Sequence, residues 1–518
     1  MPSLIPVIKV DEEKCTNCHT CISVCPVKFC NDGSGDVVRV NPDLCIGCGN
    51  CISHCTHDAR MGIDDTPEFE KLIRNKKPFI AIVAPAAASS FPDTYLNLNT
   101  WMISIGATAV FDVSYGAELT IKSYLDHITR NKPACVIAQP CPAIVSYIEL
   151  YEPGLIKYLA PADSPMLHTL KMVKEYYRQY NNYQVVMISP CFAKKREFVQ
   201  TGFNQVINLT IQSLRNYLNK NRINLTEYEK TDYINPPAER GVLFSTPGGL
   251  LETAMREVPE ILHKTRKIEG TEIIYKYLST LENSINKGIS PLIIDCLNCE
   301  KGCNAGPGTL NKDMSFDELE SLVARRSHDA VKQIAGTNVK RGLKKFKKTL
   351  SGFWKPGLYA RNYTNSSENK NYRIPDEYEL DKVYTDMLKT EKRDFYNCSA
   401  CGYGNCRDMA VAIFNGLNRP DNCHDYRQKQ VQRLHNESSE RMNIAHDALE
   451  SIEASEIGLM SEKLINFVTE QNDALTKLKQ IVEESSSVID SINPIVDSIN
   501  KISFQTMILS LNASIEAA

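Results

Sequence analysis

The chain has 518 residues, more than one compact core accommodates, so about three to five domains are expected. Its 42% hydrophobic and 23% charged residues and its net charge of -3 give no bulk attraction to nucleic acid or to an anionic membrane, and we expect neither partner. The N-terminus lacks a basic region followed by an apolar run, and the longest apolar stretch, residues 78–88, is well short of the roughly 20 residues that cross a bilayer. A cytoplasmic protein without a membrane span is therefore predicted.

Cysteine is the most informative residue type in this chain. There are 19 cysteines, and in a long cytoplasmic protein clustered C-x-x-C spacing indicates metal binding and not disulfides. Sixteen of them fall into sets with ligand-like spacing. The other three, Cys30, Cys135 and Cys296, are interpreted as packed thiols, because free cysteine is often buried.

Residues 1–64 contain two cysteine repeats with the spacing that wraps a chain around two four-iron cubanes. In this pattern three thiolates come from one repeat and the fourth comes from the other. One cluster is assigned to Cys15, Cys18, Cys21 and Cys55, and the other to Cys45, Cys48, Cys51 and Cys25. An α+β two-cluster ferredoxin-like domain that relays electrons is predicted, with paired zinc sites as the alternative.

Residues 65–372 alternate apolar strand-like runs with helical patterns, which predicts an α/β core. The strand candidates are residues 79–85, 134–140, 184–190, 241–247 and 291–297. Each is followed by functional-looking residues, as expected at strand ends in open α/β sheets. Residues 336–371 become Lys-rich and then Asn/Ser-rich, which is typical of a linker.

The remaining chain is predicted to form a small helical iron-sulfur module at residues 373–428 and a long α-helical coiled coil at residues 429–518. The module has four cysteines, Cys398, Cys401, Cys406 and Cys423. The later segment shows the three-and-four spacing of a coiled coil at Leu475, Leu478, Val482, Ser485, Ile489, Ile492, Val496 and Ile499. Pro494 interrupts this pattern and is expected to kink or loosen the helix. The fold class is thus multidomain.

Three segments of the α/β region, residues 138–142, 190–197 and 299–308, resemble in order the signature segments of the iron-only hydrogenase catalytic domain. The resemblance implies a cubane bound by Cys141, Cys191, Cys299 and Cys303. Cys303 would also bridge to a diiron unit that carries carbon monoxide, cyanide and a dithiolate. Lys194 would donate a charge-assisted hydrogen bond to a cyanide. The alternative is an iron-sulfur assembly protein with the cubane alone.

The chain also departs from the hydrogenase pattern where that family transfers protons. Pro140 replaces a cysteine, and two glutamates align with Tyr124 and His127. Leu297 replaces a methionine, and the additional thiol of Cys296 lies beside it. These changes are similar to those of sensory subgroups of the family. Whether His127 or Cys296 carries protons instead stays open, with a packing role as the alternative.

The C-terminal parts carry two further resemblances. The four-cysteine module is similar to modules that bind one cubane in sensory relatives, with a zinc site as the alternative. Residues 502–518 resemble the approach to the hairpin tip of methyl-accepting chemotaxis proteins, which bind a histidine kinase and a coupling protein. The returning helix is not part of this sequence, so we interpret it as a fragment or a truncated product. A generic coiled coil is the alternative.

Together these features predict a sensor of dihydrogen or redox state with low hydrogenase activity. Its cofactors would be four 4Fe-4S clusters and the diiron unit. Its partners would be dihydrogen and protons, a ferredoxin or similar redox protein, hydrogenase maturation proteins, the chemotaxis kinase and coupling protein, and a second copy paired through the coiled coil. The competing interpretation is a working ferredoxin-linked hydrogenase.

Overall fold

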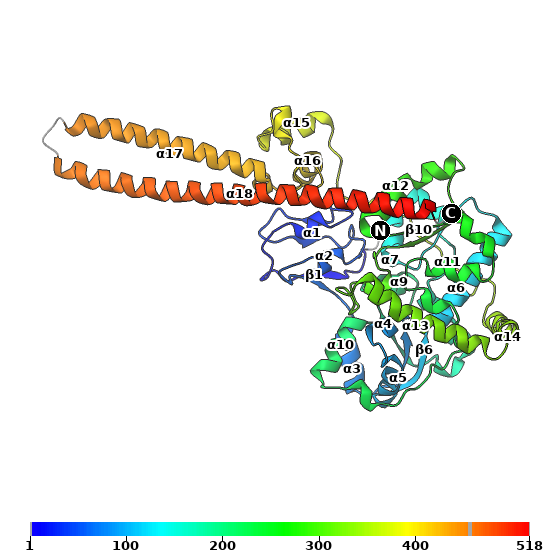
Figure 1. The fold of residues 1–518 in the computed structure, drawn as a ribbon. Helices are drawn as coiled ribbons and strands as arrows, with labels where there is room; N and C mark the ends of the chain where they lie inside the picture. The colour runs from blue at the N-terminus through cyan, green and yellow to red at the C-terminus, as the bar shows by residue number, and fades with distance from the viewer. Residues whose placement is uncertain (1–2, 454–457, 517–518) are drawn as a thin grey trace. The chain divides into compact units, whose positions relative to one another are not determined.

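The computed structural model describes residues 3–453 and 458–516. The chain divides into two compact units, residues 1–422 and residues 423–518. The first unit holds all the strands among the described residues, and the second is helical (Figure 1). No helix within the described ranges is both long enough and apolar enough to cross a membrane.

Residues 3–62 form a small region of short elements. Its strands are β1 (Ile8–Val10), β2 (Asn31–Asp32), β3 (Arg39–Val40) and β4 (Arg60–Gly62), and its helices are α1 (Thr20–Ser23) and α2 (Asn50–Ser53). β1 pairs antiparallel with β4, and β2 with β3. His19 and Gly49 precede the two helices in matching left-handed conformations, with φ of 63° and 79°. The two cysteine repeats therefore fold alike.

A four-stranded parallel sheet organises the core of the first unit. Its order is β6 (Ala107–Asp112), β5 (Phe79–Val83), β8 (Gln184–Ser189) and β9 (Ile207–Thr210). Every residue of β5 is buried. Because successive side chains of a strand point to opposite faces, Phe79 packs in one apolar cluster with Trp101, whereas Ile80 packs in another with Leu119. Both faces of the sheet are thus covered, as in parallel α/β proteins.

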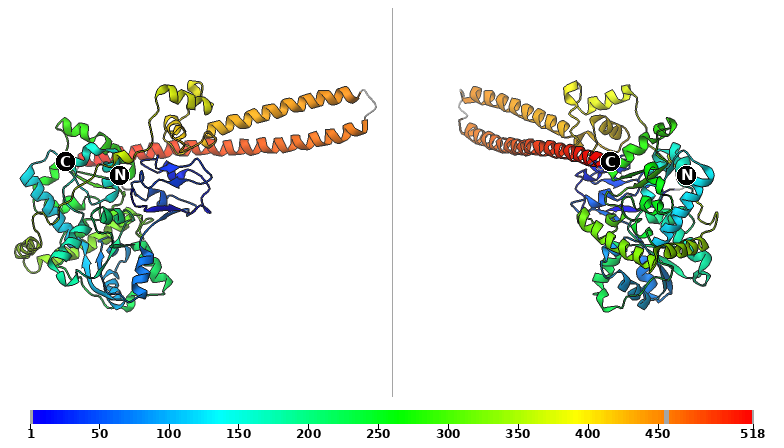
Figure 2. Two further views of the ribbon diagram at one scale, coloured as in Figure 1. Left: turned by 180° about the vertical axis from the view of Figure 1, so that it is seen from behind. Right: turned by 45° about the vertical axis from the view of Figure 1, so that its right-hand side comes forward.

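Helices surround this sheet on both sides (Figure 2). They are α3 (Thr66–Arg74), α4 (Ala87–Ser90), α5 (Tyr95–Ser104), α6 (Val113–Asn131), α8 (Pro165–Tyr176) and α10 (Ile211–Lys220). α6 is capped at its start by Asp112, whose carboxylate accepts a hydrogen bond from Ser114 N. The carboxyl end of β6 therefore leads directly into a capped helix.

A second parallel sheet has the order β10 (Thr265–Glu269), β11 (Ile293–Leu297) and β7 (Val136–Ile137). α12 (Thr271–Asn286) contacts β10, and α11 (Gly249–Met255) packs in one apolar cluster with β7 and β11. α7 (Pro142–Tyr151) contacts α9 (Lys194–Gln200), which lies against β9 of the first sheet. Four of the five predicted strands are thus present. The fifth prediction is wrong, because residues 241–247 begin with a short 3-10 turn, Gly241–Leu243. Gly241 N donates to the buried carboxylate of Glu118 at 2.7 Å, so it bonds a side chain and not a strand.

Residues 336–371, whose composition is typical of a linker, are packed on the core instead. α13 (Phe316–Ala335) is followed by α14 (Val339–Gly352), whose Phe346 and Leu350 are buried. Beyond α14, Arg361 is 6% exposed. The composition misleads because lysines cover the solvent face of α14 while a few apolar residues make its contacts.

Residues 373–422 form a small helical module with α15 (Glu377–Asp386) and α16 (Cys406–Phe414). It packs against the N-terminal cysteine region. Lys28 Nζ donates to Gly402 O at 2.9 Å, and Gly33 N donates to Leu417 O at 2.8 Å. The two regions, distant in sequence, are therefore neighbours within the first unit.

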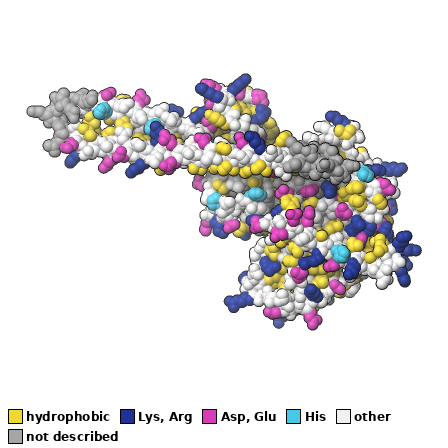
Figure 3. Space-filling view, in the orientation of Figure 1, with side chains coloured by type: hydrophobic (Ala, Val, Ile, Leu, Met, Phe, Trp, Pro, Cys, Tyr) yellow, Lys and Arg dark blue, Asp and Glu magenta, His cyan; other side chains and the backbone are white. Residues whose placement is uncertain are grey.

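The second unit contains α17 (His424–Glu453) and α18 (Gly458–Glu516), which contact each other and run in opposite directions (Figures 1 and 2). α18 continues through Pro494. A row of hydrophobic side chains follows α18 (Figure 3), and Leu478, Ile492 and Ile499 of this helix are exposed. Residues 517 and 518 of the chemoreceptor-like segment lie outside the described residues. The helix is present, and its pairing with a second copy stays a prediction.

Candidate functional site

Five cysteines of the N-terminal region line one small cavity: Cys25, Cys30, Cys45, Cys48 and Cys51. Four of them are the residues assigned from the spacing to one cubane. They come from both repeats, and Cys51 lies in α2. The donor set of four sulfurs around one cavity fits a four-iron cubane.

This cavity lies against the hydrogenase-like core. Arg196 of α9 is 2% exposed, and its guanidinium donates to Cys45 O, to Pro42 O at 3.1 Å and to Ile5 O at 2.8 Å. A Cβ placed on Gly49 would lie 2.6 Å from the ring of Pro307, so only glycine allows this approach. The second repeat is thereby fixed to the core.

The thiols of this set have shifted acidities. A hydrogen bond from Cys30 lowers the pKa of Cys45 to about 6, against the opposing effect of burial. Burial raises the pKa of the Cys51 thiol, with the neighbouring Cys45 thiolate adding to the shift. A buried thiolate must be paired with a positive charge, and iron held by the four sulfurs would supply that charge.

The other predicted set of the N-terminal region is Cys15, Cys18, Cys21 and Cys55. Arg60 Nη2 donates to Cys21 Sγ at 3.0 Å, and Val38 N donates to Cys15 Sγ at 3.4 Å. Arg60 Nη1 is buried and has no hydrogen-bond partner among the described residues. Donors aimed at sulfur, together with a buried guanidinium nitrogen that has no partner, fit an anionic iron-sulfur cluster at this place.

The four core cysteines come from three elements and converge. Cys141 precedes α7, Cys191 follows β8, and Cys299 and Cys303 follow β11. Cys299 interacts electrostatically with the other three, Cys303 with Cys141 and Cys191, and Cys191 with Cys141. Burial raises the pKa of Cys191 and of Cys303 to about 12. The structure thus brings together the cubane ligands implied by the hydrogenase resemblance.

Lys194 begins α9 beside these thiols. Its side chain is 7% exposed, and its Nζ donates to Pro140 O at 2.9 Å and to Glu197 Oε2 at 2.7 Å. An ammonium group so buried must be paired, and here a carbonyl and a carboxylate share that role. Lys194 also interacts with the thiolate form of Cys303.

Glu197 is the centre of a buried ionic network. It is fully buried, and its carboxylate accepts from Arg361 Nη1 at 2.6 Å, from Lys194 Nζ at 2.7 Å and from Ser164 Oγ at 2.9 Å. Arg361 was missed in the sequence because it lies in the linker-like segment and in no motif. Glu149 and Asp163 also act on Arg361, so the ammonium of Lys194, beside the four thiols, is the cation placed to meet an anionic group.

The residues aligned with the family's proton path lie at different depths. Tyr124 is buried in α6, and its hydroxyl oxygen accepts from Gln139 N at 3.1 Å. Burial raises the pKa of Tyr124 above its ordinary value. His127, one turn further on, is partly exposed and accepts from Asn131 Nδ2 at 2.9 Å. Tyr124 therefore contacts the backbone beside Pro140, whereas the hydrogen bond of His127 to Asn131 stays within α6.

Cys296 is also buried, with its Sγ 3.5 Å from Ala138 O. Cys296 lies in β11, and Cys299 follows that strand. Burial raises the pKa of the Cys296 thiol. The neighbouring Asp295 is 4% exposed, accepts from Leu251 N at 3.1 Å, and has its pKa raised by burial to about 7. These are the contacts of packed groups, and proton transfer through Cys296 stays a prediction.

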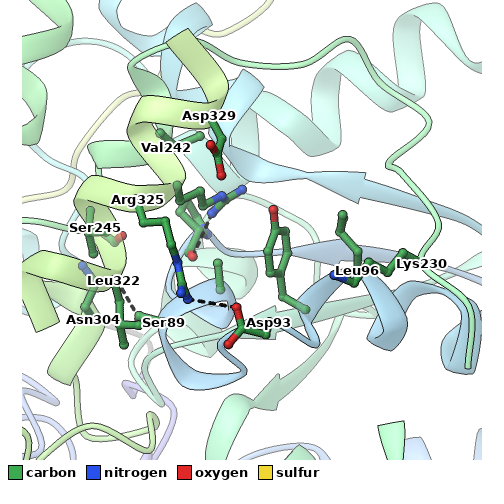
Figure 4. A pocket seen from close by; sticks show the side chains of 15 residues that line it. Ser89, Asp93, Leu96, Lys230, Val242, Ser245, Asn304, Leu322, Arg325 and Asp329 are labelled. Carbon is green, nitrogen blue, oxygen red and sulfur yellow. Dashed lines mark hydrogen bonds and ion pairs between the residues drawn. The ribbon is translucent and has the colours of Figure 1, made fainter. Parts of the chain in front are cut away.

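A cavity of about 300 Å³ lies beside the third segment (Figure 4). Ser89 Oγ donates to Asn304 Oδ1 at 3.2 Å on one side, and Arg325 pairs with Asp93 at 3.0 Å on the other. Asn304 directly follows Cys303 in the chain. The cavity therefore adjoins the residue next to the implied bridging cysteine.

The four-cysteine module is only partly assembled within the first unit. Cys398 is exposed, whereas Cys401 and Cys406 are buried, and Cys406 N donates to Asn397 Oδ1 at 2.9 Å. Cys423 begins the second unit, so its grouping with the other three stays a prediction. Over residues 3–453 and 458–516, no group of three or more His, Cys, Asp or Glu side chains has the spacing of a single-ion site.

Comparison with known families identifies three parts of the chain. Residues 77–307 match the family described as "Iron only hydrogenase large subunit, C-terminal domain". Residues 7–56 match the "4Fe-4S dicluster domain", and residues 396–424 match a family described as an Fe-S cluster. The chain is thus a hydrogenase-like iron-sulfur protein, which confirms the prediction at that level.

Individual proteins are more distant. The chain is 25% identical over 219 residues to "Cytosolic Fe-S cluster assembly factor NAR1" of Encephalitozoon cuniculi (strain GB-M1), a match over 38% of this chain. It spans 58% of the length of that curated relative. Among solved structures, an [FeFe]-hydrogenase studied for oxygen inactivation has 18% identity and a TM-score of 0.43, covering 59% of this chain and 100% of that one. HydA1 from Chlamydomonas reinhardtii has 19% identity and a TM-score of 0.42, covering 57% and 99%.

Proposed function

We propose that this protein senses dihydrogen or redox state at a cubane-plus-diiron site and passes the signal through iron-sulfur clusters to its C-terminal helices. The observation that carries the proposal is the placement of Lys194. Its ammonium is buried beside the four converging thiols and bonds both Pro140 O and Glu197. A buried ammonium at this place is the contact that the hydrogenase resemblance assigns to a cyanide of the diiron unit.

The roles of the residues follow from their contacts. Cys141, Cys191, Cys299 and Cys303 would hold the cubane, and Cys303 would join it to the diiron unit. When bound, that unit would supply the reversible chemistry of dihydrogen. Lys194 would donate to an anionic ligand of the unit, while Glu197 orients its ammonium.

Arg361 holds Glu197 in place, because its guanidinium bonds the other carboxylate oxygen at 2.6 Å. Burial of this network excludes water from the cation that faces the site. Lys194 and Arg361 share the single carboxylate of Glu197, so the ammonium of Lys194 can still attract an anion. This arrangement would hold a charged cofactor without adding a proton carrier.

Proton transfer is expected to be slow. Pro140 has neither a titratable side chain nor an N–H group. Tyr124, where a glutamate is expected, has a pKa raised by burial and stays neutral near pH 7. General acid-base assistance is typically worth 10²- to 10⁴-fold, so we expect turnover to be lower than in prototypical hydrogenases by roughly that factor.

Contacts within the first unit support an electron route. Arg196 ties the core to the second cysteine repeat, and Lys28 and Gly402 join the N-terminal region to the four-cysteine module. A route from core to repeats to module follows this order. A ferredoxin or similar protein would exchange electrons with it, and maturation proteins would load the diiron unit.

The C-terminal helix would convert cluster state into a signal. The exposed apolar row of α18 suits pairing with a second copy, because the same face recurs every three and four residues. The proposed partners of the dimer are a chemotaxis-type histidine kinase and its coupling protein. A working hydrogenase in which α18 serves only for dimerisation is the competing proposal.

Turnover separates these proposals. Protein produced with the hydrogenase maturation proteins is assayed for dihydrogen evolution from a strong reductant, beside the Pro140→Cys variant. Slow native turnover that rises in the variant supports the sensory proposal. Native turnover as fast as that of prototypical hydrogenases contradicts it.

The second candidate is iron-sulfur cluster assembly without a diiron unit, and the assembly-factor relative favours it. Under this alternative, Cys141, Cys191, Cys299 and Cys303 hold a cubane alone. Matured protein would then contain cubane iron but would lack carbonyl and cyanide ligands. Transfer of a cluster to an apoprotein acceptor would support this alternative directly.

A further inference from the structure

The cavity of the second repeat has one sulfur more than a cubane needs. Four thiolates complete the ligand set of a four-iron cubane, yet five cysteines line this cavity. The additional one is Cys30, which stands outside the repeat spacing and was interpreted from the sequence as a packed thiol. Its position in the cavity places Cys30 among the sulfurs assigned as ligands.

Cys30 lies next to two of the assigned ligands. Its Sγ is 3.7 Å from Cys25 Sγ, and Cys45 lines the same cavity. Cys30 is 2% exposed, and Asn31 Nδ2 donates to its Sγ at 3.4 Å. The sulfur is therefore inside the cavity, shielded from solvent, and oriented by a side-chain amide.

The short loop from Cys25 to Asn31 holds Cys30 in this position. Lys28, at a φ of 42°, donates from its Nζ to Ile22 O at 3.3 Å, Ser23 O at 3.0 Å and Gly402 O at 2.9 Å. The ring of Phe29 packs on those of Tyr372 at 4.9 Å and Tyr403 at 6.0 Å. The chain on the N-terminal side of Cys30 is thus anchored on both sides.

We propose that Cys30 is an alternative iron ligand of the second-repeat cubane and can replace Cys25. This rests on the cubane of the proposed function and is independent of its diiron unit. In the exchange, the iron–sulfur bond to Cys25 breaks and one to Cys30 forms. The proton leaves the Cys30 thiol and ends on the Cys25 sulfur, so no electron is gained or lost.

The short distance makes the exchange physically simple. Because the two sulfurs are 3.7 Å apart, a change of side-chain torsion suffices and no backbone movement is required. The same proximity allows Cys30 to donate an S–H hydrogen bond to the Cys25 thiolate while Cys25 is the ligand. Hydrogen bonds to the sulfurs are among the factors that set a cluster's reduction potential.

The test uses the full chain, purified without oxygen, in four variants: Cys25→Ala, Cys30→Ala, the double variant and Cys135→Ala. Iron and sulfide content and the electron paramagnetic resonance spectrum of the reduced protein are measured. Cys25→Ala is expected to keep its iron with an altered spectrum. The double variant is expected to lose one cubane, about four iron atoms per chain. Cys135→Ala removes another buried spare thiol and is expected to change neither measurement.

Two results would overturn the proposal. Loss of one cubane from Cys25→Ala alone would show that Cys30 does not take over, and a full cluster set in the double variant would show that neither thiol is needed. Should Cys25→Ala fail to fold, Cys30→Ala in the native background decides. A lower midpoint potential of one cubane is expected there, because a donor to its sulfur is lost, and an unchanged potential would count against Cys30. Absence of diiron bands would leave these outcomes untouched.

Discussion

Removing the charge of Glu197 is the most direct test of the buried ionic network that it forms with Lys194 and Arg361. Glu197→Gln keeps the size of the side chain but removes the negative charge that faces Lys194 and Arg361. Their side chains are 7% and 4% exposed, so water cannot replace the carboxylate. Breaking a buried ion pair by removing one partner typically costs about 3–5 kcal/mol. We expect a loss of that size in the free energy of unfolding.

The loss can be followed in urea by tryptophan fluorescence. Both tryptophans report on the core, because Trp101 packs in one of its apolar clusters and Trp354 against the other. With a slope of about 3 kcal/mol per molar urea, the midpoint should fall by about 1–2 M. Replacing Glu197, Lys194 and Arg361 together by apolar residues of similar volume should recover most of the loss.

The matched control is Glu12→Gln, whose partner Arg39 and own side chain are both exposed. Its midpoint should not move, because exposed ion pairs contribute little. A shift for Glu197→Gln no larger than that of the control would refute the network, since the two cations would then be solvated or paired elsewhere.

Three further outcomes follow from named groups. Burial lowers the pKa of His168 to about 3, so the unfolded chain takes up a proton at a higher pH than the folded protein does. The free energy of unfolding therefore falls as pH drops from about 6.5 toward 3. In urea midpoints measured across this range, His168→Gln should flatten that slope. Burial raises the pKa of Asp295 to about 7, so the folded state retains a proton that the unfolded chain releases. The free energy of unfolding therefore falls as pH rises from about 4 to 7. At pH 8, Asp295→Asn should be more stable than the native chain. Cys303→Ala should abolish carbonyl bands in matured protein while the N-terminal cubanes keep their iron, and unchanged bands would exclude it as the bridge.

Local spacing explains what could be predicted from the sequence. Ligands for a cubane come in short runs, so the spacing of Cys45, Cys48 and Cys51 predicts one cluster, and apolar runs such as residues 79–85 predict the buried strand β5. The strand-to-loop positions of Cys191 and Cys299 follow from the same reasoning.

Long-range pairing explains what could not be predicted. Arg361 is 164 residues from its partner Glu197, and no spacing rule connects a linker-like segment with a buried carboxylate. Cys30 belongs to no motif, and its proximity to Cys25 depends on how the loop between them folds. Residues 241–247 read as a strand, but Gly241 bonds the distant Glu118 instead. In each case a partner far along the chain decides the role.

The most direct measurement of the central claim is infrared spectroscopy of the full chain produced with the hydrogenase maturation proteins. Our account predicts metal carbonyl and cyanide bands that shift when dihydrogen is added and that disappear in Cys303→Ala. A protein with its full complement of cubane iron and no such bands would contradict the account and favour the cubane-only assembly protein.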